Sequence, residues 1–532
     1  MAELSSADRS TSPPQVRIPR DYNAAHDLLE RNLIGGRGDK IAVIDDAGSY
    51  TYNELSHRAN RFANALQSLA ISREQRIILA MHDGVDFVAA FLGAIKAGIV
   101  PIPINTLLPT KDYDFMLRDS RASALVLSEA LFATFEPAFR GKPELRHVIV
   151  SGRDAKGHLL FANLCAQAAP EFQTVQTSCD EICFWLYSSG STGRPKGTVH
   201  LHSHLIQTAE LYARAVLGIK SSDVVFSAAK LFFAYGLGNG LTFPFSVGAT
   251  TVLMAERPSP QAVARILKQH QPTVFYAVPT LFGAMLASAD LPSKSEVSLR
   301  VCTSAGEALP ADIGKRWTEK FGVEILDGIG STEMLHIFLS NRPGDVRYGT
   351  TGRAVPGYTL RLVDDEGHEV ERGELGELQI SGPSAAIMYW NNRERSRQTF
   401  MGPWTRSGDK YMQDADGYYV YSGRTDDMLK VSGQYVSPFE VESALLTHPA
   451  VLEAAVIGTT DEQGLIKPKA YVVIKPGVAQ GNGLAEELKL HVKSSLTPHK
   501  YPRWFEFVDE LPKTATGKIQ RFKLRALDQS KQ

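Results

Sequence analysis

The chain has 532 residues, which is too long for one small domain and predicts about three compact units, or one large and one small domain. Its 57 Lys and Arg residues nearly balance 58 Asp and Glu residues, so the formal net charge is −1. A near-neutral chain is not expected to bind nucleic acid in general or an anionic membrane surface. With 43% hydrophobic and 22% charged residues, the composition is that of a soluble globular protein and excludes bulk disorder.

The cysteines and the N-terminal segment favour a cytoplasmic protein. The cysteines are Cys165, Cys179, Cys183 and Cys302. No pair has C-x-x-C spacing and no histidine cluster lies nearby, so buried free thiols in a reducing compartment are expected. The first twenty residues contain no apolar core of the kind that marks a secretory signal.

Strand-like and helix-like segments alternate through most of the chain. Thr51 and Glu54 form a capping-box pair at the start of a segment with helical spacing of apolar residues. The apolar stretch 87–104 is interrupted by Lys96 and by prolines, which predicts a buried helix and a strand rather than a membrane span. Expected strands are 76–80, 124–127, 146–150, 250–254 and 274–278. This alternation predicts an α/β fold with largely parallel sheets flanked by helices.

The sequence texture changes near Arg424. Before it, residues 358–421 are rich in turns and β-type residues, which predicts a β-rich subdomain. After it, short strands at 451–457, 470–474 and 504–508 and a helix at 486–495 predict a small α+β unit. The expected organisation is a mobile tail (1–20), a large multi-subdomain adenylation domain (21–425) and a small mobile C-terminal domain (426–532).

The segment from Tyr187 to Gly197 has the composition of a phosphate-binding loop. It reads Tyr-Ser-Ser-Gly-Ser-Thr-Gly-Arg-Pro-Lys-Gly and follows an apolar run. Its glycines allow close approach of the backbone to an anion, its hydroxyl groups are donors, and Lys196 supplies a positive charge. The segment is not a Walker A loop, because it lacks the Gly-Lys-Ser/Thr ending.

This loop resembles the phosphate-binding signature of the adenylate-forming superfamily, which contains acyl-CoA synthetases, peptide-synthetase adenylation domains and luciferases. Four later segments resemble other motifs of that superfamily in the family order: 327–333, 407–409, 423–427 and 512–518. The resemblance implies a two-step reaction, in which a carboxylate attacks the α-phosphate of MgATP and a thiol then displaces AMP. Such a site must neutralise phosphate charge and exclude water.

The resemblance also implies residue roles at the nucleotide. The loop residues would cradle the β- and γ-phosphates: Ser188, Ser189, Gly190, Ser191, Thr192, Gly193 and Lys196. Glu333 would hold Mg²⁺ and Thr332 would contact the α-phosphate. Asp409 and Arg424 would bind the ribose, although an ordinary ion pair between them is the alternative. The adenine would lie between two segments: Gly306, Glu307 and Ala308 on one side, and Asp327, Gly328 and Ile329 on the other. Ile329 stands where the superfamily usually has an aromatic residue.

In the C-terminal region the resemblance implies a domain rotation between the two half-reactions. Lys518 would bridge the acid and the α-phosphate during adenylation. Asp426 would be the hinge, and rotation would bring the segment that contains Lys430 and Gly433 to the thiol tunnel. The thiol expected is coenzyme A.

The acid substrate is expected between 230–240 and 330–338. The first segment has no acidic residue that could pair with an amino group, which disfavours an α-amino acid. The two segments together resemble those of benzoate–CoA ligases most, and those of 4-hydroxybenzoate–CoA ligases almost as much. That resemblance implies a ring pocket formed by Ala234, Tyr235, Gly330, His336 and Ile337. His336 is either a polar wall of the pocket or a histidine packed beside it.

Three functions follow from these patterns: an aryl-CoA ligase acting on benzoate or another small acid, an adenylating domain that loads a carrier protein, and a nucleotide-binding regulatory protein without chemistry. The co-occurrence of Lys518, Glu333 and Thr332 argues against the third. The expected partners are a small aromatic carboxylate, ATP, CoA, a second copy of the chain in a homodimer, and a lysine acetyltransferase and deacetylase acting on Lys518. Nucleic acid and membrane are not expected partners.

Overall fold

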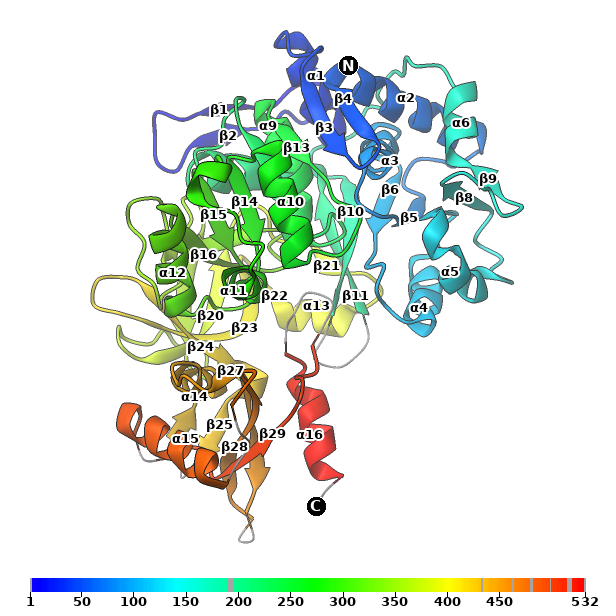
Figure 1. The fold of residues 1–532 in the computed structure, drawn as a ribbon. Coiled ribbons are helices and arrows are strands. Elements are labelled where there is room, and N and C mark those ends of the chain that lie inside the picture. The colour runs from blue at the N-terminus through cyan, green and yellow to red at the C-terminus, as the bar shows by residue number, and fades with distance from the viewer. Residues whose placement is uncertain are drawn as a thin grey trace.

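The computed structural model describes residues 2–189, 195–431, 434–461, 464–478, 482–497, 499–513 and 519–530. A large domain holds the elements from β1 to β24 (6–424), and a small domain holds those from β25 to α16 (429–529). Figure 1 shows the small domain, in orange to red, at one end of the large domain. The short turn η5 (Thr425–Asp427) joins them. The predicted α/β fold with a small α+β C-terminal unit is confirmed.

The larger sheet has nine strands in the order β18-β17-β16-β15-β14-β12-β13-β3-β4. Its strands are β3 (Ile41–Asp45), β4 (Gly48–Thr51), β12 (Val224–Ser227), β13 (Thr250–Val252), β14 (Val274–Ala277), β15 (Val301–Ser304), β16 (Ile325–Gly330), β17 (Ile337–Ser340) and β18 (Arg353–Ala354). The central strands are parallel, and β4, β17 and β18 are antiparallel at the two edges. The chain reverses its winding between β12 and β14, which makes a crevice at their carboxyl ends.

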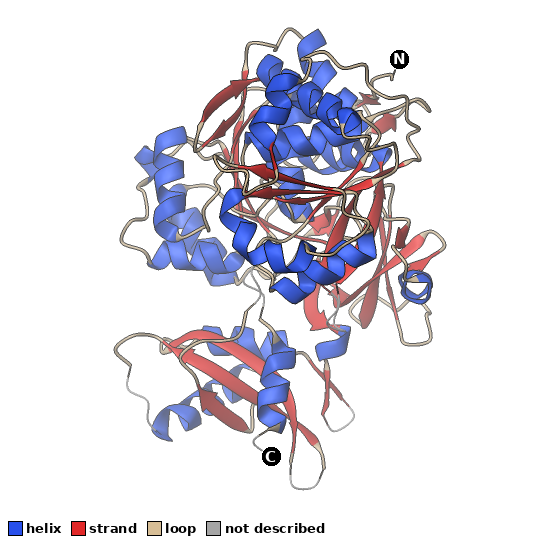
Figure 2. Ribbon diagram, turned by 90° about the vertical axis from the view of Figure 1, so that its right-hand side faces the viewer, coloured by secondary structure: helices blue, strands red, loops and turns tan. Residues whose placement is uncertain are grey.

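Helices surround this sheet, and Figure 2 shows helices on both sides of the central strands. They are α7 (His202–Thr208), α8 (Ala234–Leu237), α9 (Phe243–Val247), α10 (Pro260–His270), α11 (Pro279–Ala287) and α12 (Ala311–Phe321). Two π-helical segments, η2 (Ala209–Arg214) and η3 (Gly238–Thr242), interrupt the helices after β11 and β12, and η4 (Lys294–Glu296) is a 3₁₀ turn. Such π-helical turns often lie at functional sites.

The second sheet is fully parallel, with the order β6-β5-β7-β8-β9. Its elements are α1 (Ala24–Ile34), α2 (Tyr52–Ser68), β5 (Arg76–Ala80), α3 (Val85–Lys96), β6 (Val100–Pro103), α4 (Thr110–Ser120), β7 (Ala124–Ser128), η1 (Glu129–Leu131), α5 (Phe132–Phe139), β8 (His147–Ser151), β9 (Leu159–Leu160) and α6 (Phe161–Gln167). The predicted capping box is present, because Thr51 and Glu54 bond each other's backbone N–H groups. The apolar stretch 87–104 forms most of α3 and β6, as predicted.

The β-rich part consists of two antiparallel sheets. One contains β10 (Ile182–Ser189), β11 (Pro195–Leu201) and β21 (Met388–Tyr389), and α13 (Arg393–Thr399) follows β21. The other contains β19 (Thr359–Val363), β20 (Leu375–Ser381), β22 (Phe400–Met401), β23 (Trp404–Gln413) and β24 (Tyr419–Arg424).

The N-terminal segment forms a hairpin of β1 (Ser6–Asp8) and β2 (Gln15–Arg17). Arg9 of this hairpin donates two hydrogen bonds to the buried carboxylate of Glu210, at 2.6 and 2.8 Å. The mobility expected for residues 1–20 stays a prediction. All four cysteines are free, as predicted; Cys183 and Cys302 are buried, whereas Cys165 and Cys179 are half-buried.

The small domain has its own hydrophobic core around Val441, Val456, Val472 and Leu488. Its elements are β25 (Leu429–Val431), β26 (Gln434–Val436), α14 (Pro438–Leu446), β27 (Val451–Thr460), β28 (Ile466–Ile474), α15 (Asn482–Ser495), β29 (Trp504–Phe507) and α16 (Arg521–Gln529). A separate core is typical of a unit that can move as one body. Within the described residues, no helix is long and apolar enough to cross a membrane.

Candidate active site

The ends of the hairpin β10–β11 hold the described part of the predicted phosphate loop. Ser188 and Lys196 are cross-strand partners at its open end. The Ser188 hydroxyl donates to Glu333 Oε1 at 3.3 Å, which brings the predicted phosphate residue beside the predicted metal ligand. Burial lowers the pKa of the Lys196 ammonium from its usual value, and the Glu333 carboxylate opposes this shift. Lys196 of the loop and Glu333, which follows β16, thus lie at one site.

Tyr389 belongs to this site although the sequence patterns did not single it out. Its hydroxyl donates to Glu333 Oε1 at 2.7 Å, and the Lys196 ammonium lies 4.5 Å from the centre of its ring. Because β21 pairs with β11, Tyr389 lies opposite Thr198 on the neighbouring strand. This strand pairing and a hydrogen bond from the N–H of Ala386 to the carbonyl of Glu333, at 2.7 Å, bring Tyr389 to Glu333. Both contacts are long-range, so no local pattern could have revealed the role of Tyr389.

The carboxylate of Glu333 fits a Mg²⁺ ligand. Hydrogen bonds from the described residues reach Oε1 only, which leaves Oε2 as a hard oxygen donor. No cluster of three or more His, Cys, Asp or Glu residues suited to a metal occurs in the described part of the chain. Mg²⁺ is usually held by one or two carboxylates together with substrate phosphates.

The predicted adenine residues lie at the carboxyl ends of β15 and β16. Gly306, Glu307 and Ala308 are in the loop after β15, and Gly306 needs the positive φ of 98° that glycine accepts. Asp327 and Ile329 are in β16 itself. Asp327 is buried, its Oδ1 has no hydrogen-bond partner among the described residues, and burial raises the pKa of its carboxyl well above the usual range. A buried polar atom of this kind fits a hydrogen-bonding ligand such as a purine base.

The two predicted ribose residues are cross-strand partners on β23 and β24. Arg424 Nη1 lies 3.2 Å from Asp409 Oδ1 and also donates to the carbonyl of Ser407. The Asp409 carboxylate is the main cause that raises the pKa of Arg424. The ion pair weighed as an alternative to ribose binding is therefore present. Ribose binding by these two residues stays a prediction.

The predicted acid pocket lies at the carboxyl ends of the central parallel strands. Tyr235 is the second residue of α8, which follows β12, and its hydroxyl bonds Thr303 Oγ1 of β15 at 2.6 Å. Ala234 and Ile337 are buried nearby in the same core cluster. Gly330 pairs with Ile337 across β16 and β17, and a side chain at position 330 would lie 2.5 Å from the carbonyl of His336. The structure thus brings these predicted residues together at one end of the central strands.

His336 is packed among aromatic rings and is almost fully buried. The centres of the Phe243, Tyr212 and Tyr235 rings lie 4.4, 5.4 and 5.6 Å from its own. Its Nε2 donates to the carbonyl of Tyr235 and to Asn239 Oδ1, both at 3.2 Å, which leaves Nδ1 as a buried acceptor without a partner among the described residues. Burial lowers the pKa of His336 to about 3. His336 is therefore a neutral, buried imidazole, and both interpretations of it, a pocket wall or a histidine packed beside the pocket, stay predictions. Asn239 in the π-helical turn η3 is a partner that the sequence patterns did not predict.

The hinge and thiol residues lie on a different part of the molecule. Asp426 is exposed in η5, where no hydrogen bond from a described residue holds its side chain. Lys430 lies in the hairpin β25–β26, which contacts the large domain through a hydrogen bond from Tyr435 to Asp365 at 3.1 Å. No hydrogen bond or ion pair between described residues joins Lys430 to the Glu333 cluster, which consists of Glu333, Ser188, Lys196 and Tyr389. Gly190, Ser191, Thr192, Gly193, Gly433 and Lys518 lie outside the described residues, as does the side chain of Ser189.

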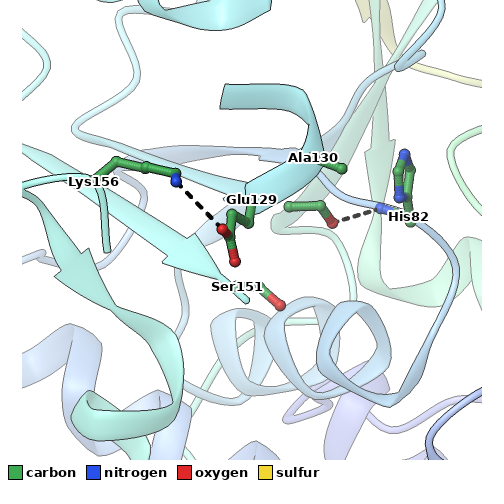
Figure 3. A pocket seen from close by; sticks show the side chains of 6 residues that line it. His82, Glu129, Ala130, Ser151 and Lys156 are labelled. Carbon is green, nitrogen blue, oxygen red and sulfur yellow. Dashed lines mark hydrogen bonds and ion pairs between the residues drawn. The ribbon is translucent and has the colours of Figure 1, made fainter. Parts of the chain in front are cut away.

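A separate pocket of about 500 Å³ lies at the carboxyl ends of β7 and β8. Figure 3 shows its lining, which consists of His82, Ser128, Glu129, Ala130, Ser151 and Lys156. Lys156 is paired with Glu129 and Asp154, and the hydroxyl of Ser151 donates to Asp86. None of the predicted site residues lines this pocket.

Comparison with known proteins places the chain in a family. The family model for the AMP-binding enzyme matches residues 30–390, and that for the AMP-binding enzyme C-terminal domain matches residues 440–518. The chain belongs to the AMP-binding enzyme family. It is 62% identical over 528 residues to a benzoate–CoA ligase of Thauera aromatica, covering 99% of this chain and 100% of the relative.

Two further similarities extend over nearly the whole length. The chain is 50% identical to a 4-hydroxybenzoate–CoA/benzoate–CoA ligase of Rhodopseudomonas palustris, covering 96% of this chain and 94% of the relative. A crystal structure of a benzoate CoA ligase from Burkholderia xenovorans LB400 matches with a TM-score of 0.90 and 58% identity, covering 95% of this chain and all of that one. The resemblance to adenylate-forming enzymes stated from the motifs is thus confirmed.

Proposed function

We propose that the protein is an ATP-dependent, AMP-forming benzoate–CoA ligase. It would convert benzoate, ATP and CoA to benzoyl-CoA, AMP and pyrophosphate through a benzoyl-adenylate. The full-length relationship to the benzoate–CoA ligase of Thauera aromatica carries this proposal. The buried aromatic crevice around His336, beside the Glu333 cluster, supports it.

In the first half-reaction the benzoate carboxylate attacks the α-phosphate of ATP, and pyrophosphate leaves. Two anions approach each other, so this chain must supply positive charge and hydrogen-bond donors where negative charge develops. Lys196 and the loop 188–193 would hold the β- and γ-phosphates, and Thr332 the α-phosphate. Lys518 would bridge the carboxylate and the α-phosphate. Mg²⁺, when bound at Glu333, would supply a further positive charge against the phosphate oxygens.

The nucleoside would lie along the carboxyl ends of β15 and β16. Gly306, Glu307, Ala308, Asp327, Gly328 and Ile329 would contact the adenine. The buried carboxyl of Asp327 supports this role, since its Oδ1 has no partner among the described residues. Asp409 and Arg424 would contact the ribose hydroxyls from within their ion pair.

The ring of the acid would lie against Ala234, Tyr235, Gly330, His336 and Ile337. Because the imidazole of His336 is neutral and the other four residues carry no charge, this site suits an uncharged aromatic ring. The carboxylate would then face the phosphate site, where the cations lie. This arrangement disfavours both α-amino acids and long alkyl chains.

The second half-reaction needs the small domain in a different position. We assign the hinge to Asp426, with a large domain ending at residue 425 and a small mobile domain from 426 to 532. Rotation there would remove Lys518 and bring Lys430 and Gly433 to the CoA thiol. The exposed side chain of Asp426 and the separate core of the small domain support this assignment.

The remaining assignments concern the setting of the enzyme. We place it in the cytoplasm, with a homodimer as its assembly. We also propose that a lysine acetyltransferase modifies Lys518 and that a deacetylase reverses this. Acetylation would remove the positive charge and stop adenylation. Full ATP–pyrophosphate exchange by protein acetylated at Lys518 would refute this regulation.

A second candidate function is 4-hydroxybenzoate–CoA ligation, which the relative from Rhodopseudomonas palustris favours. A third is loading of a carrier protein in place of CoA. AMP release with benzoate, 4-hydroxybenzoate and palmitate, each measured with and without CoA, separates these functions. The proposal predicts the highest rate with benzoate and CoA. Efficient turnover of palmitate, or adenylation without any CoA thioester, would contradict it.

A further inference from the structure

The described residues that flank the segment 514–518, which contains Lys518, are joined to each other in the small domain. Lys513 and Ile519 pair as an antiparallel bridge, and the N–H of Gln520 donates to the carbonyl of Pro512 at 2.8 Å. These contacts join the two ends of the segment 514–518. Ile519 and Leu524 also pack in one hydrophobic cluster with Leu511. The described residues on the two sides of this segment therefore form one base, to which Lys518 is linked directly through Ile519.

Arg521, the first residue of α16, anchors that base to α14. Its Nη2 donates to both oxygens of Glu442, at 2.8 and 2.7 Å, and its Nε donates to Oε1 at 3.2 Å. Glu442 Oε1 also accepts from the N–H of Val456 on β27 at 2.7 Å. Only 18% of the Arg521 side chain and 6% of that of Glu442 are exposed. A buried fork of this kind has one defined geometry.

The same arginine reaches the turn that joins the two domains. Arg521 Nη1 lies 3.5 Å from Asp427 Oδ2, and Arg525 Nη1 donates to Asp427 Oδ1 at 2.8 Å. Arg521 and Arg525 are four residues apart, so both lie on the face of α16 that meets η5. Asp427 directly follows Asp426. Three residues after Lys518, the chain is thus ion-paired to the residue next to the assigned hinge.

We propose that Arg521 is a positioning residue for adenylation, which couples the Lys518 loop through Asp427 to the hinge turn. The inference rests on the proposed roles of Lys518 and Asp426. The pairing makes the exit of the hinge, α14 and the base of the loop one rigid unit. A rotation at residue 426 is then transmitted directly to Lys518. Without the pairing, the hinge could turn while the loop stayed out of register with the α-phosphate.

The test compares two half-reactions under single turnover: formation of benzoyl-adenylate from benzoate and ATP, and conversion of supplied benzoyl-adenylate with CoA. Asp427→Ala removes the hinge link and leaves the buried Arg521–Glu442 pair intact, so the small domain keeps its anchor. Arg521→Lys keeps the charge but not the fork. Lys518→Ala is the reference. Lys500→Ala is the matched control, because the Lys500–Glu440 pair also involves α14 but has no contact with η5.

We expect Asp427→Ala and Arg521→Lys to slow adenylation by about 10- to 100-fold, as misplacement by an ångström does. Their conversion of supplied benzoyl-adenylate should stay close to that of the unmodified protein, which a general loss of folding would not allow. Lys500→Ala should leave both steps unchanged. Suppose that Lys518→Ala loses adenylation alone. Unchanged adenylation in Asp427→Ala and Arg521→Lys would then overturn the inference, and so would an equal loss of both half-reactions in these two variants. If Lys518→Ala loses both steps equally, the proposed division of labour fails and this inference fails with it.

Discussion

The proposed acid site around His336 and the proposed hinge of the small domain are built from different kinds of interaction. Around His336 the groups are buried, aromatic and neutral, and burial lowers the pKa of the imidazole to about 3. Around Asp427 two arginines and two carboxylates form a network that reaches the surface. An apolar wall selects by shape, whereas paired charges fix one geometry of a moving part. Under the proposed roles, substrate choice and the order of the half-reactions would depend on regions that can be altered separately.

The largest loss of adenylation rate is expected from a change at Lys518 in the small domain. Lys518→Ala removes the cation that would offset the charge developing at phosphorus. Losing one such contact costs about 10²–10³-fold in rate. ATP–pyrophosphate exchange with benzoate measures this step alone. An exchange rate within a few-fold of the unmodified protein would show that Lys518 has no role in adenylation.

The buried imidazoles of the large domain should make its stability depend on pH. Burial lowers the pKa of His336 to about 3 and those of His200 and His202 to about 4. As the pH falls below about 6.5, these imidazoles take up protons in the unfolded chain but not yet in the folded protein. The free energy of unfolding therefore declines between pH 6.5 and the folded-state pKa values. At pH 5 the loss is about 2 kcal/mol for each imidazole.

Urea unfolding of the protein at pH 7.5 and pH 5 measures this difference. His202→Asn should reduce the difference, because one buried imidazole is then missing in both states. Equal free energies of unfolding at the two pH values would contradict the assignment of neutral, buried histidines in the large domain.

Replacing a bulky side chain at the proposed ring site by alanine should change the relative kcat/KM for different benzoates by a moderate amount. His336→Ala removes a ring that packs against Phe243 and should admit para-substituted benzoates. A pocket discriminates a methylene-sized change by about 1–3 kcal/mol, so a tenfold gain in kcat/KM for 4-methylbenzoate relative to benzoate is expected. Ile337→Ala should act in the same direction. An unchanged ratio in both variants would place the para position elsewhere.

The smallest effect on adenylation is expected from a change at Tyr389, through the affinity for Mg²⁺. Tyr389→Phe removes the hydroxyl that donates to Glu333 Oε1 and leaves the ring under Lys196 in place. A charge-assisted hydrogen bond of this kind contributes about 1.5–3 kcal/mol at most, and water can replace part of it. The Mg²⁺ concentration needed for half-maximal adenylation should therefore rise several-fold. Mn²⁺ affinity of the enzyme–ATP complex, measured by electron paramagnetic resonance, should fall in parallel, and an unchanged affinity would refute the role.

Local patterns predicted much of this molecule. The strand β5 has the predicted bounds, and the capping box at Thr51 is present as expected. The motif residues Ser188 and Glu333 do meet, because both lie at strand ends of the β-rich and α/β parts. Tyr389, Asn239 and Arg521 were not predicted. Each contributes through a partner more than 50 residues away, and no spacing within a segment encodes such a contact.

The central claim is that the small domain acts in two separable steps while the acid crevice stays in place. The most direct test is the single-turnover conversion of supplied benzoyl-adenylate and CoA to benzoyl-CoA by the Lys518→Ala variant. The account predicts a rate close to that of the unmodified protein, because Lys518 has left the site when the thiol attacks. A loss as large as the loss in adenylation would contradict the rotation at Asp426.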